Sequence, residues 1–408
     1  MNPKKIFPTD GKYIPPVYTS KRKKNVRLPA AVQTARRARR TSAAMTVGKA
    51  VRRTLFVLVT LLFGAVYALL ALCGTIANGP SPTVRNLLVL SAMQASATKW
   101  VPGLFLDDAT VEQILADSRV INTDVISLED YAASNHGGDD PAQPDKDEWA
   151  DAQDGMLFHT ISGSTYKAYV LIVKDPSRVY VGTSSDYKSG RVGARIFDIT
   201  ARDDAVAAIN GGEFYDVGGQ GTGNTPIGLT YALGECVWDD GYRRTFIGFD
   251  KDDQMVVSEK MTRTEADQRG IRDAVSFQTG NVLIDHDGDS IHLYYADSNT
   301  GTAQRTAIGQ RADGAVILLA TDGRTASSLG ATHNDVIDIM VSYGAVTAAM
   351  LDGGSSTMMY YEDYYTKYGI ATDTLDQYQL KGLVNKYKAF TNPRRIPTYF
   401  MVSKEVNE

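Results

Sequence analysis

The sequence predicts a mixed α+β protein, in which one N-terminal transmembrane helix and a helical stem precede a single sheet-rich globular domain. The transmembrane helix is predicted from an uncharged apolar stretch, Thr54 to Asn78. Residues 155–408 are of single-domain size, and their short apolar runs separated by tight turns are typical of strands. One helix is well signalled among these strands, at His333 to Tyr343.

Residues 1–53 form a basic tail. They hold fifteen Lys and Arg against the single acid Asp10, and a segment of this composition is expected to stay solvated and disordered. The transmembrane helix at 54–78 is long enough to cross a bilayer, which takes roughly 20 residues. It lies too far from the N-terminus for an ordinary cleaved signal peptide. The positive charge before it predicts a cytoplasmic N-terminus and an extracytoplasmic C-terminal part.

The charge balance argues against nucleic acid as a partner. Without the tail's fifteen positive and one negative residues, the formal net charge changes from −4 to −18. Attraction to anionic lipid explains the tail's basic residues, at about 1 kcal/mol for each one near the surface. The lipid bilayer is therefore the expected partner of this end of the chain. Cys73 lies in the span and Cys236 is alone beyond it, which leaves no disulfide framework and no cysteine-based zinc site outside.

Two connecting segments follow the span. Residues 79–126 are interpreted as a helical stem, because apolar residues recur at near-helical spacing from Val84 to Ala97 and Asp107-Asp108 opens a second helical stretch. Residues 127–154 are rich in acids and have almost no apolar periodicity, which is typical of a flexible linker. The globular domain is expected to occupy residues 155–408.

Strand patterns dominate that domain. Its well-signalled helix has Thr332 and Asp335 at capping-box spacing and an apolar stripe along one face. The helix leads directly into a strand, Ala345 to Leu351. Six further strands are predicted, at Ala168–Val173, Val179–Gly182, Ala205–Ile209, Thr245–Phe249, Val282–Ile284 and Ala315–Ala320.

The strand at Ala345 ends abruptly in a Gly-Gly-Ser-Ser turn that follows Asp352. The glycine pair permits unusual backbone angles. Such a turn can aim backbone N–H groups and hydroxyls at one point, which would make an anion-binding nest beside the acid. The alternative is a tight turn whose aspartate caps its own backbone.

Three further stretches place polar or charged residues directly at a predicted strand end. Each of them alone is also explained by hairpin chemistry. Four such turns in one domain indicate a shared site. The three stretches are 205–216 with Asn210, Gly211, Gly212, Glu213 and Asp216; 304–309 with Arg305; and 321–324 with Asp322 and Arg324.

These motifs resemble those of the phosphodiester glycosidase family in order and spacing. The stretches are AINGGEFYD, RTAIGQRADG, TDGR and MLDGGSSTM, and the resemblance covers roughly residues 155–404, ending in a segment similar to the family's closing strand. Two positions depart from the family's pattern, which usually has an aromatic residue in place of Glu213 and a third glycine in place of Ser355. The resemblance leaves the exact substrate open.

The resemblance implies hydrolysis of a sugar C1–O bond whose leaving group is a phosphate ester. In a membrane-anchored, extracytoplasmic chain the expected substrates are glycosyl-1-phosphodiesters of envelope or exopolysaccharide material. A phosphate leaves well without full protonation, so the site must chiefly stabilise an oxocarbenium-like sugar and hold the phosphodiester. Asp352 is expected to act as base or as electrostatic partner of the sugar cation, and Asp322 and Glu213 are the other catalytic candidates.

Arginine side chains and glycine backbone N–H groups suit the phosphate. Asn210 is expected to bind a sugar hydroxyl or to fix its turn, and Ser356 to donate to phosphate or to Asp352. The predicted substrate-binding residues are Asn210, Gly211, Gly212, Arg305, Arg324, Gly353, Gly354 and Ser356.

No cofactor is expected, and the sequence leaves a divalent cation such as calcium open. Asp285 to Asp289 lacks the twelve-residue calcium-loop pattern with its closing Glu, so a hairpin turn is predicted there. The glycines from Gly218 to Gly223 lack nucleotide-binding spacing and are expected to form a mobile loop over the site. His292 and His333 are expected to be structural.

The competing hypothesis is a non-catalytic, membrane-tethered module that binds glycosyl-phosphate polymers or lipid-linked intermediates during envelope polysaccharide assembly. The carboxylates discriminate between the two hypotheses. A binder of anionic sugars gains nothing from acids beside the phosphate, whereas a glycosidase requires at least one.

Overall fold

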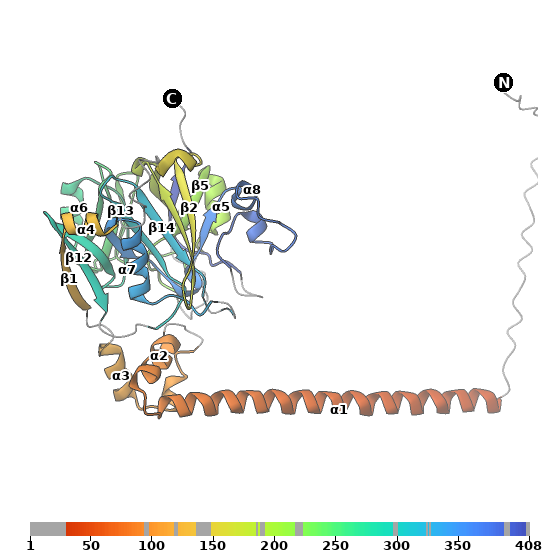
Figure 1. Ribbon diagram of the computed structural model, residues 1–408. Helices are drawn as coiled ribbons and strands as arrows, with labels where there is room; N and C mark the ends of the chain where they lie inside the picture. Colours follow the sequence, from red (N-terminus) through yellow and green to blue (C-terminus); the bar gives the residue numbers. More distant parts are fainter. Residues whose placement is uncertain are drawn as a thin grey trace, which may run out of the picture. The chain divides into compact units, whose positions relative to one another are not determined.

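The computed structural model describes most of the chain, in two units (Figure 1). The units are Met1–Leu70 and Ala71–Glu408. The described residues are 30–93, 98–117, 121–135, 148–184, 187, 192–216, 223–296, 301–323, 325, 328–386 and 392–404.

Helix α1 (Ala30–Ala77) contains the predicted transmembrane helix. Its residues Lys49–Ala77 are long and apolar enough to cross a membrane. The helix already begins at Ala30, so residues 30–53 of the predicted disordered tail are helical in the structure. The physical reason is the high helix propensity of the alanines and arginines in this stretch. Residues 1–29 of the tail lie outside the described residues.

Both predicted stem helices are present, as α2 (Pro82–Met93) and α3 (Asp108–Asp117). The short 3-10 helix η1 (Pro102–Leu104) lies between them in the chain. The Thr110 backbone N–H donates to Asp107 Oδ1 at 2.7 Å, which satisfies an otherwise free donor at the start of α3. A small core holds α2 and α3 together, made of Val89, Leu90, Val111 and Ile114.

The largest sheet has eight strands, and every pairing described within it is antiparallel. The strands predicted at 168–173, 282–284, 315–320 and 345–351 all form in this sheet. Helix α7 (His333–Ser342) lies against it (Figure 1). Its strand order is β1 (Ile121–Ser127), β12 (Ser290–Ala296), β11 (Val282–Asp287), β15 (Ala345–Met350), β13 (Thr306–Arg311), β14 (Val316–Thr321), β3 (Lys167–Val173) and β2 (Met156–Ser162).

The structure differs from the predicted boundaries of the stem and the linker. Strand β1, expected within the stem, pairs with β12 along its whole length and so belongs to the main sheet. Helix α4 (Leu128–Asn135) and the 3-10 helix η2 (Glu148–Asp151) lie where the flexible linker was expected. Tyr131 of α4 is buried in the main core, and its hydroxyl donates to the Ala345 carbonyl at 2.6 Å. One buried aromatic side chain thus holds α4 against the domain, where the composition predicts a flexible linker.

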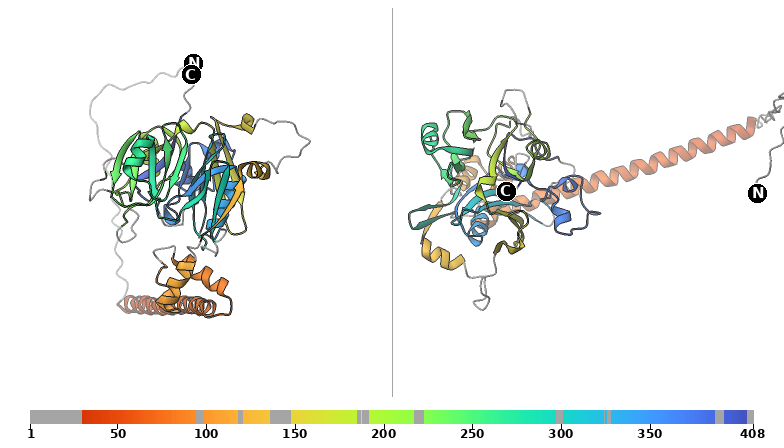
Figure 2. Two further views of the ribbon diagram at one scale, coloured as in Figure 1. Left: turned by 90° about the vertical axis from the view of Figure 1, so that its left-hand side faces the viewer. Right: turned by 90° about the horizontal axis from the view of Figure 1, so that it is seen from above.

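Two smaller antiparallel sheets complete the domain, and Figure 2 shows the five-stranded one, in green, on one side. The five-stranded sheet has the order β7 (Glu235–Asp239), β6 (Leu229–Ala232), β10 (Ile271–Phe277), β8 (Thr245–Asp250) and β9 (Met255–Ser258). The four-stranded sheet has the order β16 (Met359–Tyr361), β5 (Ala205–Asn210), β17 (Thr398–Ser403) and β4 (Val179–Thr183). The remaining helices are η3 (Pro176–Arg178), α5 (Ile196–Arg202), α6 (Arg263–Arg269), α7 (His333–Ser342), η4 (Gly354–Ser356), α8 (Tyr364–Lys367) and η5 (Gln379–Lys381).

The predicted capping box of α7 is confirmed. Thr332 Oγ1 accepts from the Asp335 N–H at 3.1 Å, and Asp335 Oδ2 accepts from the Thr332 N–H at 2.7 Å. The helix covers the main core with its buried Val336, Ile339 and Met340. A fixed start for α7 also fixes where the following strand, β15, begins.

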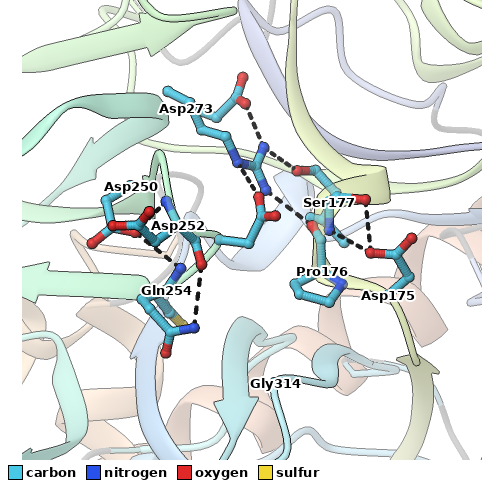
Figure 3. Close-up of polar contacts among 12 residues, drawn as sticks. Asp175, Pro176, Ser177, Asp250, Asp252, Gln254, Asp273 and Gly314 are labelled. Atoms are coloured by element: carbon cyan, nitrogen blue, oxygen red, sulfur yellow. Dashed lines mark hydrogen bonds and ion pairs between the residues drawn. The ribbon is translucent and has the colours of Figure 1, made fainter.

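An ionic cluster around Arg272 joins the five-stranded sheet to β4 and its preceding turn. Figure 3 shows Asp273 of this cluster near Pro176. The Arg272 guanidinium lies 2.7 Å from Asp273 Oδ2 and 2.7 Å from Asp253 Oδ1. It also donates to the carbonyls of Pro176 and Val179. Arg272 is the second residue of β10, whereas Phe277 ends that strand. The cluster is therefore at the opposite end of β10 from the polar turns described next.

Candidate functional site

The four predicted turns meet at one end of the strands. The register pairs Ala307 of β13 with Met350 of β15, which brings the start of one strand beside the end of the other. The Asn210 side chain, at the end of β5, donates to the Asp352 carbonyl at 2.6 Å. The eight-stranded and four-stranded sheets therefore contribute to the same site.

Asn210 is fully buried and makes three hydrogen bonds. Besides its bond to Asp352, its Oδ1 accepts from Thr306 Oγ1 at 2.8 Å and from the Met358 N–H at 3.0 Å. These contacts match the prediction that Asn210 fixes its turn. They leave no exposed part of the side chain for a sugar.

Gly211 and Gly212 allow backbone segments to approach closely. A Cβ atom at Gly212 would lie 2.2 Å from the Ser276 carbonyl oxygen, and one at Gly211 would lie 2.5 Å from Thr398 Oγ1. Their N–H groups donate to the Thr398 carbonyl and hydroxyl at 2.9 and 3.2 Å. Both glycines were predicted to bind substrate, but the structure uses their N–H groups in packing.

The Gly353-Gly354 turn rests on the backbone of Gln304. The Gly354 N–H donates to the Gln304 carbonyl at 2.9 Å, and a Cβ at Gly353 would lie 2.9 Å from the same oxygen. Gly354 has φ +60°, which a glycine adopts without strain. The Ser356 and Thr357 N–H groups donate within the turn, to Gly353 and Gly354. These three N–H groups are therefore occupied, and the predicted anion nest does not form from them.

Asp352 has the electrostatic surroundings of a catalytic carboxylate. Its side chain is partly buried, and burial raises its pKa to about 6. The charge of Glu213 raises the pKa further, whereas a hydrogen bond from Ser356 and the charge of Arg394 lower it. Ser356 thus contacts Asp352, as one of its two predicted roles requires. A carboxyl group with a pKa near 6 can change its protonation state close to neutral pH.

Arg394 is the site residue that the sequence reasoning missed. Its Nη1 donates to Ser356 Oγ at 3.3 Å, and its Nη2 lies 3.4 Å from Asp216 Oδ2. The guanidinium side chain is 20% exposed, so it is accessible to a ligand. The available signal was the Arg394-Arg395 pair shortly before the closing strand.

Glu213 provides a second carboxylate beside Asp352. Its Oε1 accepts from Gln278 Nε2 at 3.1 Å. Its Oε2 is buried and has no hydrogen-bond partner within the described part of the chain. A buried carboxylate oxygen without a donor is energetically costly.

Asp322 is tied into the fold on both oxygens. Oδ2 accepts from the Tyr169 hydroxyl at 3.0 Å and Oδ1 from the Lys386 N–H at 2.7 Å. The side chain is 3% exposed, and this burial raises its pKa. These contacts are those of a structural turn. They fit the hairpin explanation of this stretch better than a catalytic role for Asp322.

Of the two arginines predicted to bind phosphate, the structure describes Arg305, whose guanidinium is used in packing. The Arg305 guanidinium donates to the Ala331 carbonyl at 3.1 Å and to the Gly301 carbonyl at 3.0 Å, so it clamps two loops together. Arg324 lies outside the described residues. Arg394 occupies the place beside Asp352 that was predicted for a phosphate-binding arginine.

No metal centre is formed by the described residues, since none of their acidic, histidine or cysteine side chains gather in groups of three or more suited to an ion. Asp287 pairs with Ser290 across the two-residue turn between β11 and β12, as the predicted hairpin requires. His333 is buried, which lowers its pKa to about 4, and its Nε2 lies 3.0 Å from the Tyr294 carbonyl. Residues 218–222 of the predicted mobile loop lie outside the described part.

Comparison with known proteins identifies the family. Residues 203–403 match the phosphodiester glycosidase family. This part of the chain belongs to that family. The match includes the Asn210, Asp322 and Asp352 turns and also Arg394. It supports, at the family level, a hydrolase that acts on phosphodiester-linked sugars.

Individual relatives of this phosphodiester glycosidase domain are distant. An uncharacterized SPbeta prophage-derived protein of Bacillus subtilis, YomE, is 29% identical over 138 residues, which are 34% of this chain and 20% of that protein. The chain thus spans about a fifth of the length of this relative. The zebrafish N-acetylglucosamine-1-phosphodiester alpha-N-acetylglucosaminidase catalytic domain, auto-inhibited by its pro-peptide, gives a TM-score of 0.43 at 16% identity over 69% of this chain and 88% of that one. A hypothetical protein from Synechocystis gives 0.45 at 13% identity over 62% of each chain.

The raised pKa of Asp352 predicts a pH-dependent effect on stability. The folded protein holds this proton more tightly than the unfolded chain, in which the pKa of an aspartate is about 3.9. Stability is therefore lost as the pH rises from about 4 to about 6, because the folded state must then bury a charge. Asp352→Asn removes that charge. We expect the melting temperature of the variant, relative to the unmodified protein, to rise across this interval and to level off above it.

The matched control is Asp252→Asn, because the Asp252 side chain is 68% exposed. Its melting temperature should follow that of the unmodified protein at every pH. Thermal melts from pH 4 to pH 8 measure both variants. A difference for Asp352→Asn that does not change with pH would contradict a raised pKa.

Proposed function

We propose that the protein is a membrane-anchored extracytoplasmic hydrolase that cleaves the glycosidic bond of glycosyl-1-phosphodiesters in envelope or exopolysaccharide material. The observation that carries the proposal is the position of Asp352. In a phosphodiester glycosidase domain, this carboxyl group has a pKa of about 6 and lies beside the cation of Arg394 and the second acid Glu213.

In the proposed reaction, Asp352 acts in its charged form. It stabilises the positive charge that develops on the sugar, or it orients the attacking water. The oxygen of water bonds to C1, the C1–O bond breaks, and the bonding electrons leave with the phosphate oxygen. The products are a free sugar and a phosphomonoester, and the proton from water passes to the solvent.

Arg394 is the proposed ligand of the phosphate. Its guanidinium is planar and can bind two phosphate oxygens at once. It already lies beside Ser356, so a phosphate bound there is adjacent to the catalytic turn. Its charge also favours the ionised form of Asp352. The unpartnered Oε2 of Glu213 is the proposed acceptor for a sugar hydroxyl.

The decisive variant is Asp352→Asn, which keeps the shape of the turn and removes its charge. Turnover of a glycosyl-1-phosphodiester should fall by about two to three orders of magnitude, as expected for the loss of one acid–base or electrostatic group. Substrate affinity should be retained or should increase, because the anionic substrate no longer meets a negative charge. Reducing-sugar release and binding are both measured on the purified protein.

Asp322→Asn is the control for this experiment, since Asp322 is a buried carboxyl with structural contacts. It should lower the melting temperature and leave turnover per folded molecule within about tenfold of the unmodified protein. A stable Asp352→Asn protein with undiminished turnover would contradict the mechanism. A chain that binds these substrates without ever releasing sugar would be the binding module of the competing hypothesis.

The proposed location depends on α1 crossing the membrane with its basic N-terminus in the cytoplasm. The domain from residue 121 onward is then exposed outside. Protease added to intact cells should remove this domain and leave the N-terminal tail protected. Protection of the domain until the cells are lysed would show the opposite orientation.

A further inference from the structure

An exposed apolar segment lies at the end of the candidate membrane span. Trp100 and Leu104 keep 61% and 52% of their surface exposed. Phe105 beside them packs on Gly74, where a Cβ would lie 3.2 Å from two ring carbons. Gly74 belongs to the last turn of α1, and the span ends at Ala77. The segment is therefore held where a spanning helix leaves the bilayer, which is the depth that tryptophan prefers.

The stem connects this segment directly to the globular domain. Gly301 has φ +76°, and a Cβ there would lie 2.8 Å from backbone atoms of both Leu90 and Ser91 in α2. The Thr302 N–H donates to Ser91 Oγ at 3.3 Å. Helix α2 thus packs on the loop that precedes β13, with no room for a side chain at Gly301.

The same loop supports the catalytic turn. Arg305 donates to the Gly301 carbonyl, which fixes the part of the loop that contacts α2. Gln304, three residues after Gly301, accepts from the Gly354 N–H at 2.9 Å. The stem and the Asp352 turn therefore lie at the same end of the domain and share one supporting loop.

The chain between the span and this loop is short. From Ala77 to Leu90 it reaches at most about 30 Å, since α2 rises 1.5 Å per residue and the extended residues before it contribute no more than about 3.6 Å each. The predicted flexible linker does not intervene, because β1 and α4 are integrated into the domain. Leu90, where the stem contacts the supporting loop, therefore stays within about 30 Å of the end of the span.

We propose that the substrate is lipid-linked: a glycosyl-1-phosphodiester whose phosphate is esterified to a long alkyl or isoprenoid chain in the same membrane. Trp100 and Leu104 insert into the head-group layer and hold the catalytic turn over it. Water adds to C1, the C1–O bond breaks, the phosphomonoester remains in the bilayer with its lipid, and the sugar enters the water phase. This inference rests on the proposed function and on α1 as a membrane span.

The test uses the full-length protein in phospholipid vesicles with two substrates that share one sugar-1-phosphate. One is esterified to octadecanol and placed in the same vesicles, and the other is esterified to methanol and dissolved. Glucose, galactose and N-acetylglucosamine 1-phosphates serve as the sugar series. We expect the membrane-bound ester to be hydrolysed at least about tenfold faster at equal total concentration, because both partners share the membrane surface.

A double variant, Trp100→Ser with Leu104→Ser, separates membrane docking from catalysis. It should lose about tenfold in rate on the membrane-bound ester and stay within about twofold on the dissolved one. Tyr242→Ser is the matched control, because Tyr242 is 63% exposed on the loop between β7 and β8. It should leave both rates unchanged.

A binding measurement does not depend on turnover. Brominated lipids in the vesicles should quench part of the protein's tryptophan fluorescence. In the Trp100→Phe variant this quenching should be absent. Absence of this quenching in the unmodified protein would overturn the docking of Trp100. Equal or faster hydrolysis of the dissolved ester would overturn the lipid-linked substrate and leave the proposed function intact, whereas hydrolysis of neither ester would overturn both.

Discussion

The candidate site depends on the buried side-chain amide of Asn210. This one group joins β5 of the four-stranded sheet, the start of β13 in the eight-stranded sheet and the turn that contains Asp352. A buried amide is costly unless it is hydrogen-bonded, so these segments must stay together for the group to be satisfied. The position of the proposed catalytic carboxylate is thus set by a residue that makes no contact with solvent.

Opposing electrostatic effects act on the carboxylate placed in this way. Burial and the charge of Glu213 raise the pKa of Asp352, while Ser356 and Arg394 lower it, and the result is about 6. Two acids beside one cation suit a reaction in which a sugar becomes positive and a phosphate departs with negative charge. The same burial that adjusts the pKa makes the charged site costly to fold, as is common at functional sites.

Local sequence patterns were sufficient for much of the fold and for the position of the Asp352 turn. Helix α7 and strand β15 follow from a capping box, an apolar stripe and an abrupt Gly-Gly stop, all of which are contained in neighbouring residues. Strand β1 and the helix with Tyr131 were missed, because their order depends on partners more than 160 residues away. Arg394 was missed for a similar reason. The Arg305 guanidinium donates to the Ala331 and Gly301 carbonyls, whereas that of Arg394 donates to Ser356, and tertiary packing decides these partners.

In the proposed mechanism, the Asp352 turn directs cleavage to the sugar side of the phosphodiester. Hydrolysis in water enriched in ¹⁸O tests it most directly, because the label marks the atom that the water attacks. Mass spectrometry of both products should find one ¹⁸O in the hydroxyl on C1 of the sugar and none in the phosphomonoester. Label in the phosphate would mean that the P–O bond is broken, and would contradict a glycosidase mechanism.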